Sequence, residues 1–280
     1  MREITCTDIT AAVERLCIRA ATVLTPDVCA AIERASATEP SEAGRAALED
    51  MVANFQCAAA DTLPICQDTG MAVVFVDMGQ EVHITGGDFN EAITEGVRQG
   101  YVNGYLRKSV VADVFRRVNT EDNTPAVIHT RIVPGDKLTL TVAPKGFGSE
   151  NKSAMRMFLP SASVEEYEDY ITGVVKTAGA DPCPPVVVGV GIGGTVEKAA
   201  ELAKRALIRP LDERNADPFY ADMERRTLEK INKLGIGPQG FGGRTTALAV
   251  NINAFAAHIA GTACVVNIGC HVTRHATEIL

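Results

Sequence analysis

The stretch Met71-Ala-Val-Val-Phe-Val76 decides the fold class, because the chain changes there from helical to strand patterning. Its six apolar residues include three valines and an aromatic ring, which is typical of a buried strand. Before it, apolar residues recur at helical spacing, and Thr25-Pro26-Asp27 and Pro40-Ser41-Glu42 are helix start signals. We therefore predict an α+β fold. Residues 1–280 would form one domain, in which a helical part (about 1–62) packs on a mixed α/β part (about 63–280) with further helices.

Strands and helices alternate irregularly after this stretch. Residues 81–85 follow the first strand across a Gly-containing turn, and residues 126–133 and 137–142 flank Pro134-Gly135-Asp136, which predicts a β-hairpin. The other predicted elements are a strand over 186–190, helices over 89–105, 196–208 and 218–234, and mixed strand and helix over 245–266.

Composition narrows the class of protein. The chain has 280 residues, of which 46% are hydrophobic and 22% charged, so it can bury a large core. No apolar run approaches the roughly 20 residues that span a bilayer, and the first ten residues lack the features of a secretion signal. The net charge of −8 speaks against a nucleic-acid surface. We expect a cytoplasmic protein that binds neither membranes nor nucleic acids, whereas a few cations in a cleft still allow an anionic substrate.

Three of the eight cysteines lie in loop sequences built from Gly, Pro, Asp, Thr and His, and they carry the strongest functional signal. They are Cys66 in LPICQDTG (63–70), Cys183 in ADPCPP (180–185) and Cys270 in NIGCHV (267–272). In a reducing compartment we expect thiols or metal ligands rather than disulfides. Three thiolates from loops suit an iron–sulfur cluster with one iron left open to a substrate.

Three of the other five cysteines have a structural explanation. Cys17, Cys29 and Cys57 fall on the predicted helices, where a buried thiol behaves as a small hydrophobic group, so we expect core packing for them.

Two other uses of Cys and His remain open. Cys66 or Cys270 with a nearby imidazole would make a nucleophile, although one such pair leaves the other loop cysteines without a purpose. His271 and His275 are four residues apart and fit one face of a metal site, but Val272 stands where a zinc protease has its glutamate. Zinc hydrolysis is therefore not favoured.

The segment Gly189-Val-Gly-Ile-Gly-Gly194 matches the dinucleotide-binding pattern G-x-G-x-x-G. A dinucleotide-binding unit continues with a second apolar strand that ends in an acidic residue about 20 positions on. Here residues 209–218 form a polar loop instead. We interpret these glycines as a tight strand-to-helix turn.

A Gly-rich loop opens into a predicted helix near Ser149, in the sequence PKGFGSENKS (144–153). Unpaired amides at such a junction bind a carboxylate or phosphate, and the alternative is that Ser149 caps the helix without a ligand. Upstream, Arg107 and Lys108 follow the helix predicted over 89–105 and bring two cations together.

Several motifs in order make the chain resemble a known family. They are CQDTG (66–70), LRKS (106–109), NTPA (123–126), KGFGSEN (145–151), CPP (183–185), GIGGT (191–195), GPQG (237–240) and CHVTRH (270–275). The chain resembles the N-terminal half of class I fumarases, and is most similar to the alpha subunit of the two-subunit fumarate hydratases and L-tartrate dehydratases. The resemblance covers most of the chain.

The resemblance implies a cofactor and an activity. A 4Fe-4S cluster would be held by Cys66, Cys183 and Cys270, with its fourth iron open to the substrate. The implied activity is reversible hydration of fumarate to (S)-malate, with dehydration of L-tartrate to oxaloacetate as the alternative. A non-catalytic iron–sulfur interaction subunit is a distant third.

The resemblance also implies roles for single residues. Asp68 would act as acid or base and Gln67 would contact the dicarboxylate. Arg107 would hold carboxylate oxygens by paired hydrogen bonds, and the amides around Gly148 would be further donors to them. The alternative for Asp68 is an Asx-turn in the segment Asp68-Thr69-Gly70.

Single-chain family members continue beyond the third cluster cysteine, whereas this sequence stops at Leu280. We therefore expect a separate beta subunit that completes the site, together with pairing of alpha chains. An exposed apolar surface around the cluster loops would be the footprint of that partner.

Overall fold

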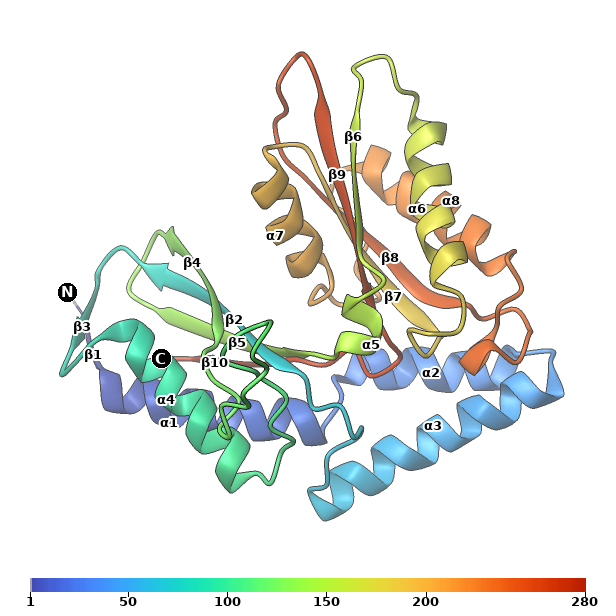
Figure 1. Cartoon of the computed structure of the whole chain (residues 1–280). Helices are drawn as coiled ribbons and strands as arrows, with labels where there is room; N and C mark the ends of the chain where they lie inside the picture. The colour runs from blue at the N-terminus through green and yellow to red at the C-terminus, as the bar shows by residue number, and fades with distance from the viewer. Residues whose placement is uncertain (1) are drawn as a thin grey trace. The chain divides into compact units, whose positions relative to one another are not determined.

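The computed structural model describes residues 2–280, and its internal contacts divide them into two compact units (Figure 1). Unit 1 contains the stretch up to Thr25 together with Phe55–Phe147 and Arg274–Leu280, and unit 2 contains Pro26–Asn54 and Gly148–Thr273. Each unit combines helices with one four-stranded sheet, so the predicted α+β fold is confirmed. None of the helices in the described residues has the length and apolar character needed to cross a bilayer.

Unit 1 is built on the sheet β10-β5-β2-β4. Its elements in chain order are β1 (Arg2–Thr5), α1 (Cys6–Thr22), β2 (Met71–Gly79), β3 (Val82–Thr85), α4 (Phe89–Asn103), β4 (Val127–Val133), β5 (Leu138–Lys145) and β10 (Ala276–Ile279). The central strand β2 contains the apolar stretch that marks the start of strand patterning, and its residues 72–76 are buried.

The predicted hairpin of β4 and β5 is wrong, although both strands exist. Strand β2 lies between them: Val74 pairs with Ile128 of β4 in parallel and with Val142 of β5 in antiparallel orientation. Strand β3 likewise pairs with β1 rather than with β2, from which only a short turn separates it. The sequence patterns mark these strands but do not determine which strands pair.

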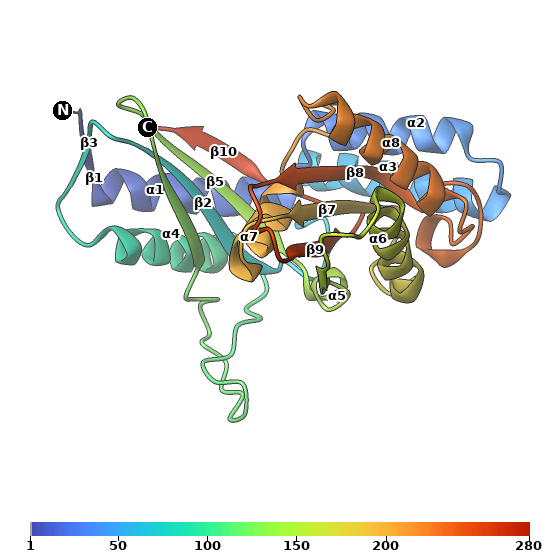
Figure 2. The same ribbon diagram turned by 90° about the horizontal axis from the view of Figure 1, so that it is seen from above.

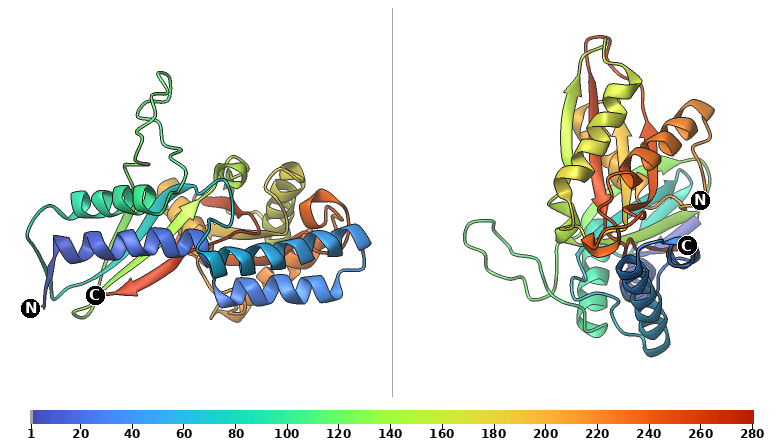
Figure 3. Two further views of the ribbon diagram at one scale, coloured as in Figure 1. Left: turned by 90° about the horizontal axis from the view of Figure 1, so that it is seen from below. Right: turned by 90° about the vertical axis from the view of Figure 1, so that its right-hand side faces the viewer.

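Helices α1 and α4 lie side by side and α1 packs on the sheet of unit 1 (Figure 3). Glycines on α4 allow this close approach, because a Cβ on Gly96 or Gly100 would come within 2.6 Å of the Cβ of Val13 or Cys17. Cys17 is fully buried at this contact, which confirms the core role predicted for it.

Unit 2 is built on the sheet β6-β9-β7-β8. Its elements are α2 (Pro26–Thr38), β6 (Ala154–Phe158), α6 (Val164–Ala178), β7 (Val186–Ile192), α7 (Val196–Ala206), α8 (Pro218–Asn232), the 3-10 turn η1 (Pro238–Gly240), β8 (Ala247–Ala254) and β9 (Thr262–Gly269). The chain passes between the units within α3 (Glu42–Asp61) and α5 (Phe147–Glu150). Two strands replace the mixed strand and helix expected over 245–266, and neither β6 nor α6 was anticipated.

Helices cover both faces of the sheet of unit 2, α7 on one face and α6 with α8 on the other (Figures 1 and 2). The strand β9 shows the alternation this requires: Ala263 and Val265 cluster with α7, whereas Val266 and Ile268 cluster with α6 and α8. A Cβ on Gly191 of β7 would lie 1.9 Å from the carbonyl oxygen of Ala199 in α7. Gly191 thus allows the close packing of β7 on α7, and Gly193 and Gly194, with φ of +93° and +65°, form the tight strand-to-helix turn that was expected.

Candidate functional site

Burial separates three of the five non-loop cysteines, Cys6, Cys17 and Cys264, from the three loop cysteines. Cys17 and Cys264 are fully buried, and burial raises the pKa of both thiols, that of Cys264 to about 12. Such cysteines stay protonated and make poor metal ligands. Cys183 is exposed, and Cys66 and Cys270 are half-buried. The core role expected for Cys57 is wrong, because its position on α3 faces solvent, and Cys29 is only partly buried.

The Cys183 loop joins α6 to β7 in unit 2 and is tightly constrained. Cys183 has a left-handed backbone conformation with a φ of +55°, and its N–H donates to the carbonyl of Ala180 at 3.0 Å. The next carbonyl, that of Pro184, accepts the backbone N–H of Gln239 at 2.8 Å and the Gln239 Nε2 at 3.0 Å. The GPQG motif (237–240) therefore holds the residue after Cys183 from outside the loop.

The Cys270 loop follows β9 and reaches the Cys183 loop through His271. The N–H of His271 donates to the carbonyl oxygen of Cys183 at 3.3 Å, and the His271 Nδ1 lies 3.0 Å from the same oxygen. A carbonyl only accepts, so Nδ1 donates this hydrogen bond in the tautomer that carries the ring proton on Nδ1. In the same loop the Thr273 hydroxyl donates to the Cys270 carbonyl at 2.7 Å. Unit 2 thus links two of the three predicted cluster cysteines through their backbones.

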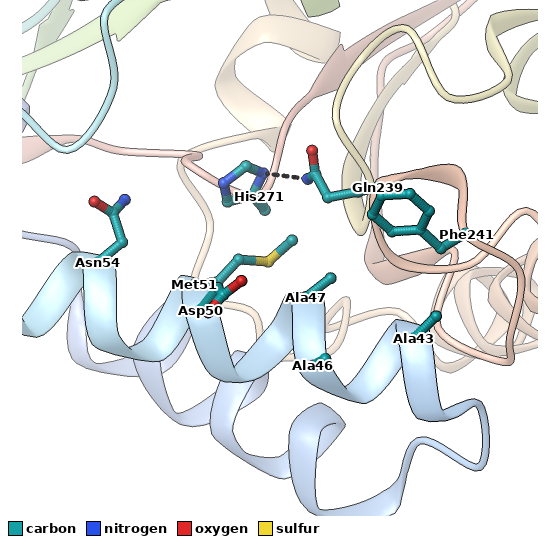
Figure 4. A pocket seen from close by; sticks show the side chains of 9 residues that line it. All are labelled: Ala43, Ala46, Ala47, Asp50, Met51, Asn54, Gln239, Phe241 and His271. Atoms are coloured by element: carbon teal, nitrogen blue, oxygen red, sulfur yellow. Dashed lines mark hydrogen bonds between the residues drawn. The ribbon is translucent and has the colours of Figure 1, made fainter.

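A cavity of about 500 Å³ lies beside His271 (Figure 4). Helix α3 forms one wall with Ala46, Ala47 and Met51, and Gln239 and Phe241 contribute from the opposite side. Small side chains on α3 leave space next to the Cys270 loop.

The third predicted cluster cysteine, Cys66, lies in unit 1, in the CQDTG loop that leads into β2. Its Sγ lies 3.2 Å from the Oε1 of the exposed Gln67. The half-buried Asp68 accepts two backbone hydrogen bonds, from Gly70 N–H to Oδ1 at 3.0 Å and from Phe147 N–H to Oδ2 at 2.8 Å. The first of these is the Asx-turn considered as the alternative for Asp68.

Residues to which the sequence analysis assigned no role bind the backbone of the CQDTG loop. The buried Tyr101 hydroxyl lies within hydrogen-bond distance of the carbonyls of Thr69 (2.9 Å) and Gly70 (3.0 Å), and Asn123 Nδ2 donates to the Gly70 carbonyl at 3.1 Å. Burial raises the pKa of Tyr101, so it remains a donor. Arg274, 5% exposed, donates to the Asp68 carbonyl. Asn123 and Arg274 belong to two of the motifs that carry the resemblance, which was the only signal available for them.

Arg107 is anchored to the same loop by its backbone. Its N–H donates to Thr69 Oγ1 at 2.9 Å, and the Thr69 hydroxyl lies 3.2 Å from the Arg107 carbonyl. The residue is exposed, and within residues 2–280 its guanidinium has no hydrogen bond or ion pair. It therefore has donors available for a carboxylate.

The Gly-rich loop forms only one helical turn, α5, before the chain enters β6. Ser149 is buried inside this turn and does not cap it, so the capping explanation is wrong. Gly148 is exposed. The turn is held by Glu150, which accepts Lys204 Nζ and, at 2.8 Å, the Nδ2 of Asn267 on β9. Burial lowers the pKa of Lys204, and Glu150 opposes that effect.

The donor set fits an iron–sulfur cluster in its chemistry. Thiolates are the ligands such clusters take, and all three loop cysteines are at least partly accessible while the core cysteines are not. Cys66 belongs to unit 1 and the other two cysteines to unit 2. Within residues 2–280, no three His, Cys, Asp or Glu side chains are gathered as a ready metal site. The three-cysteine ligand set therefore stays a prediction.

Comparison with known proteins shows where the chain belongs. The sequence model of the family described as fumarate hydratase matches residues 10–278. The chain belongs to the fumarate hydratase family. This confirms the resemblance inferred from its motifs. The description of the family names a hydratase, and the names of the relatives specify a dehydratase. Family membership therefore supports a lyase that adds or removes water.

Relatives within the fumarate hydratase family cover nearly the whole chain. A Methanocaldococcus jannaschii protein, provisionally named L(+)-tartrate dehydratase subunit alpha, is 38% identical over 264 residues, which cover 92% of this chain and 93% of the relative. An Escherichia coli K12 protein named L(+)-tartrate dehydratase subunit alpha is 32% identical over 258 residues, covering 91% and 84%. A Shigella sonnei protein of the same name matches to the same extent.

Proposed function

We propose that this chain is the alpha subunit of a hydro-lyase that dehydrates L(+)-tartrate to oxaloacetate, and that a separate beta subunit completes its active site. The observation that carries the proposal is the agreement among relatives 32–38% identical over about nine-tenths of the chain, whose names specify tartrate and an alpha subunit. Their names favour tartrate over the fumarate expected first from the motifs. Hydration of fumarate to (S)-malate is the second candidate, favoured by the description of the family.

The chemistry requires a proton carrier near the substrate carbon. Loss of water from tartrate breaks one C–H and one C–O bond, so a base takes the carbon-bound proton while the hydroxyl leaves. We assign a proton-transfer role to Asp68. Its two oxygens each accept one backbone N–H, which fixes the plane of the carboxylate and leaves lone pairs on both oxygens. The carboxylate is thus oriented before a substrate arrives.

Arg107 is assigned to a substrate carboxylate. A guanidinium binds a carboxylate through two parallel hydrogen bonds, and the Arg107 backbone is tied to Thr69, the neighbour of Asp68. Gln67 and the amide of Gly148 are proposed as further substrate contacts, because both residues are exposed, Gln67 in the CQDTG loop and Gly148 in the single turn of α5.

Cys66, Cys183 and Cys270 are proposed to hold a 4Fe-4S cluster. When bound, the cluster supplies Lewis-acid polarisation of the substrate at its open iron. Accessibility and loop position support this assignment, as does the contrast with the buried thiols of Cys17 and Cys264.

The proposal of a partner chain is supported by exposed apolar side chains that lie close in sequence to Cys66 and to Gln239, which holds the Cys183 loop. Leu63, three residues before Cys66, is 52% exposed, and in unit 2 Phe241, two residues after Gln239, is 65% exposed. Apolar side chains left exposed in this way suit burial by another chain. The beta subunit is the proposed partner, and pairing of alpha chains remains part of the proposal.

The ligand set is tested by anaerobic reconstitution of the full chain with iron and sulfide. Cys66→Ser, Cys183→Ser and Cys270→Ser should each lower the iron and sulfide bound per chain, whereas Cys57→Ser, a matched change at an exposed cysteine on α3, should not. Iron retained in all three variants would refute the ligand set and return Cys66 to the candidate nucleophiles.

The substrate is tested on the chain co-expressed with its beta subunit. L(+)-tartrate, D-tartrate, fumarate and (S)-malate are compared by kcat/KM, with D-tartrate as the stereochemical control. Preference for L(+)-tartrate of tenfold or more supports the proposal, and the reverse preference assigns the fumarate reaction. A complex that binds a cluster but converts none of the four would favour the non-catalytic role.

A further inference from the structure

Cys183 holds a backbone conformation that needs support from outside its loop. The left-handed region, with φ at +55°, is unfavourable for an L-residue and persists only where neighbouring groups hold it. Both carbonyls that follow are held by other segments. The Cys183 carbonyl is bonded by His271, and the Pro184 carbonyl by Gln239.

Gln239 acts as a double clamp. Its backbone N–H and its side-chain Nε2 both donate to the Pro184 carbonyl, at 2.8 and 3.0 Å, which uses both lone pairs of that oxygen. Gln239 is itself left-handed, with a φ of +51°, and the turn around it packs closely on the Cys183 loop. A Cβ on Gly240 would lie 2.4 Å from the Cβ of Ala180. Two strained turns therefore support each other.

His271 connects the two cysteines. It follows Cys270 directly, and both its backbone N–H and its ring Nδ1 reach the Cys183 carbonyl. Figure 4 shows His271 and Gln239 facing each other beside the cavity along α3, with Gln239 Nε2 3.3 Å from His271 Nδ1. The carbonyl of Cys183, one proposed ligand, is thus hydrogen-bonded by His271, the residue that follows Cys270, another proposed ligand.

We propose that Gln239 and His271 are positioning residues, which lock the Cys183 loop to the Cys270 loop so that two thiols are placed before any cluster is inserted. As it concerns the cluster, this inference rests on the proposed function. Groups that orient metal ligands in this way typically change metal affinity by about 10–100-fold when removed. Neither residue needs to touch iron or substrate for this effect.

The test compares paired variants of the full chain after anaerobic reconstitution with iron and sulfide. Readouts are iron and sulfide per chain and the rate of iron loss to a chelator. The His271→Ala variant should lose iron at least about tenfold faster than the natural chain. His271→Asn should restore retention, because its side-chain N–H₂ can donate where Nδ1 does. His83→Asn, at an exposed position on β3, is the matched control and should behave as the natural chain.

Comparing Gln239→Ala with Gln239→Gly separates the effect of losing the side-chain amide on iron retention from the effect of backbone strain at this position. Glycine relieves the positive φ but also removes the amide, so both variants should lose iron equally fast. Retention by Gln239→Gly at the natural rate would show that the amide is not a clamp. If His271→Ala fails to fold, His271→Asn and Gln239→Gly still decide the question.

Hydrogen exchange of the apo chain makes the outcome independent of the cluster. The amides of Cys183 and His271 should exchange at least tenfold faster in Gln239→Ala and His271→Ala. If the natural chain takes up no iron, the proposed function fails while this measurement still tests the clamp. If the natural chain takes up a cluster and both alanine variants keep it at the natural rate, the inference is overturned and the proposed function stands.

Discussion

The backbone N–H of Phe147 donates a 2.8 Å hydrogen bond to the Oδ2 of Asp68, which ties the CQDTG loop to the residue where α5 begins. The N–H of Gly70 donates to the other oxygen, Oδ1, and forms the Asx-turn, so each oxygen of the carboxylate accepts one backbone hydrogen bond. The turn and the proton chemistry weighed for Asp68 are therefore compatible, because one bond per oxygen orients the carboxylate without exhausting its lone pairs.

Replacing Asp68 by Asn should remove the proton carrier while keeping the shape of the side chain. We expect kcat of the assembled enzyme to fall by about 10²–10⁴-fold, the usual contribution of a positioned acid or base, with a smaller change in KM. Steady-state kinetics on L(+)-tartrate checks this. Asp77→Asn on β2, whose carboxylate pairs with Arg131 at the surface, is the matched control. An Asp68→Asn enzyme with the natural kcat would remove Asp68 from the mechanism.

Gly70→Ala should destabilise unit 1 more than an ordinary glycine substitution at positive φ. Gly70 has a φ of +77°, and an added Cβ would lie 2.7 Å from the carbonyl carbon of Lys145. Gly86 has a φ of +81° with open space around it, so Gly86→Ala measures the conformational cost alone, about 1–2 kcal/mol. The clash at Gly70 should add about 1–3 kcal/mol. Urea unfolding of both variants gives the difference, and equal losses would contradict the predicted clash.

Glu224 of α8 is fully buried and pairs with the Nη1 of Arg209 at 2.8 Å. It also accepts the backbone N–H of Ile252 on β8 at 2.8 Å. Glu224→Gln leaves a largely buried guanidinium without its counter-charge, so we expect a loss of about 3–5 kcal/mol in unfolding free energy. Glu229→Gln, on the same helix but in an exposed pair with Arg225, should cost at most about 0.5 kcal/mol. Chemical denaturation compares the two variants directly, and similar losses would argue against the buried pair.

Asp122 should make stability depend on acid pH. Burial by itself would raise the pKa of Asp122, but hydrogen bonds from Arg98 and Thr124 outweigh it and lower the pKa to about 2. Because the folded pKa lies below the unfolded value of about 3.9, the contribution is complete above about pH 5 and is lost as the pH falls through the folded pKa of about 2.

Urea midpoints for the natural chain and for Asp122→Asn should therefore differ at pH 6 and converge as the pH falls below about 2. A difference between the two proteins that stays constant over this range would show that Asp122 titrates normally in the folded state.

Local composition was sufficient to predict some features and insufficient for others. Loop sequences rich in Gly and Pro separated Cys66, Cys183 and Cys270 from the buried cysteines, because the same residues that form loops leave a thiol accessible. The pairing of β2 with both β4 and β5 was not predictable from the turn between β4 and β5, since the choice depends on a strand about fifty residues upstream of β4.

The supports of the candidate site escaped prediction for the same reason. Tyr101 reaches the carbonyls of Thr69 and Gly70 across 32 and 31 residues, and Gln239 reaches Pro184 across 55. No periodicity or spacing in the sequence encodes contacts that the tertiary fold creates. Motif resemblance identified the segments that contain Gln239 and Arg274, but only the structure shows what these residues hold, and Tyr101 lies in none of the motifs.

The strand β10 pairs with β5, so Thr277 meets Thr141 across 136 residues of chain. During synthesis the sheet of unit 2 can form from a nearly continuous segment, whereas the sheet of unit 1 lacks its last strand until residues 276–279 have left the ribosome. Until then β5 presents an unpaired edge, the kind of surface on which nascent chains aggregate. Folding of unit 1 is therefore expected to be the slow, chaperone-sensitive step in making this protein, and disruption of residues 276–279 should lower the yield of folded chain far more than their number suggests.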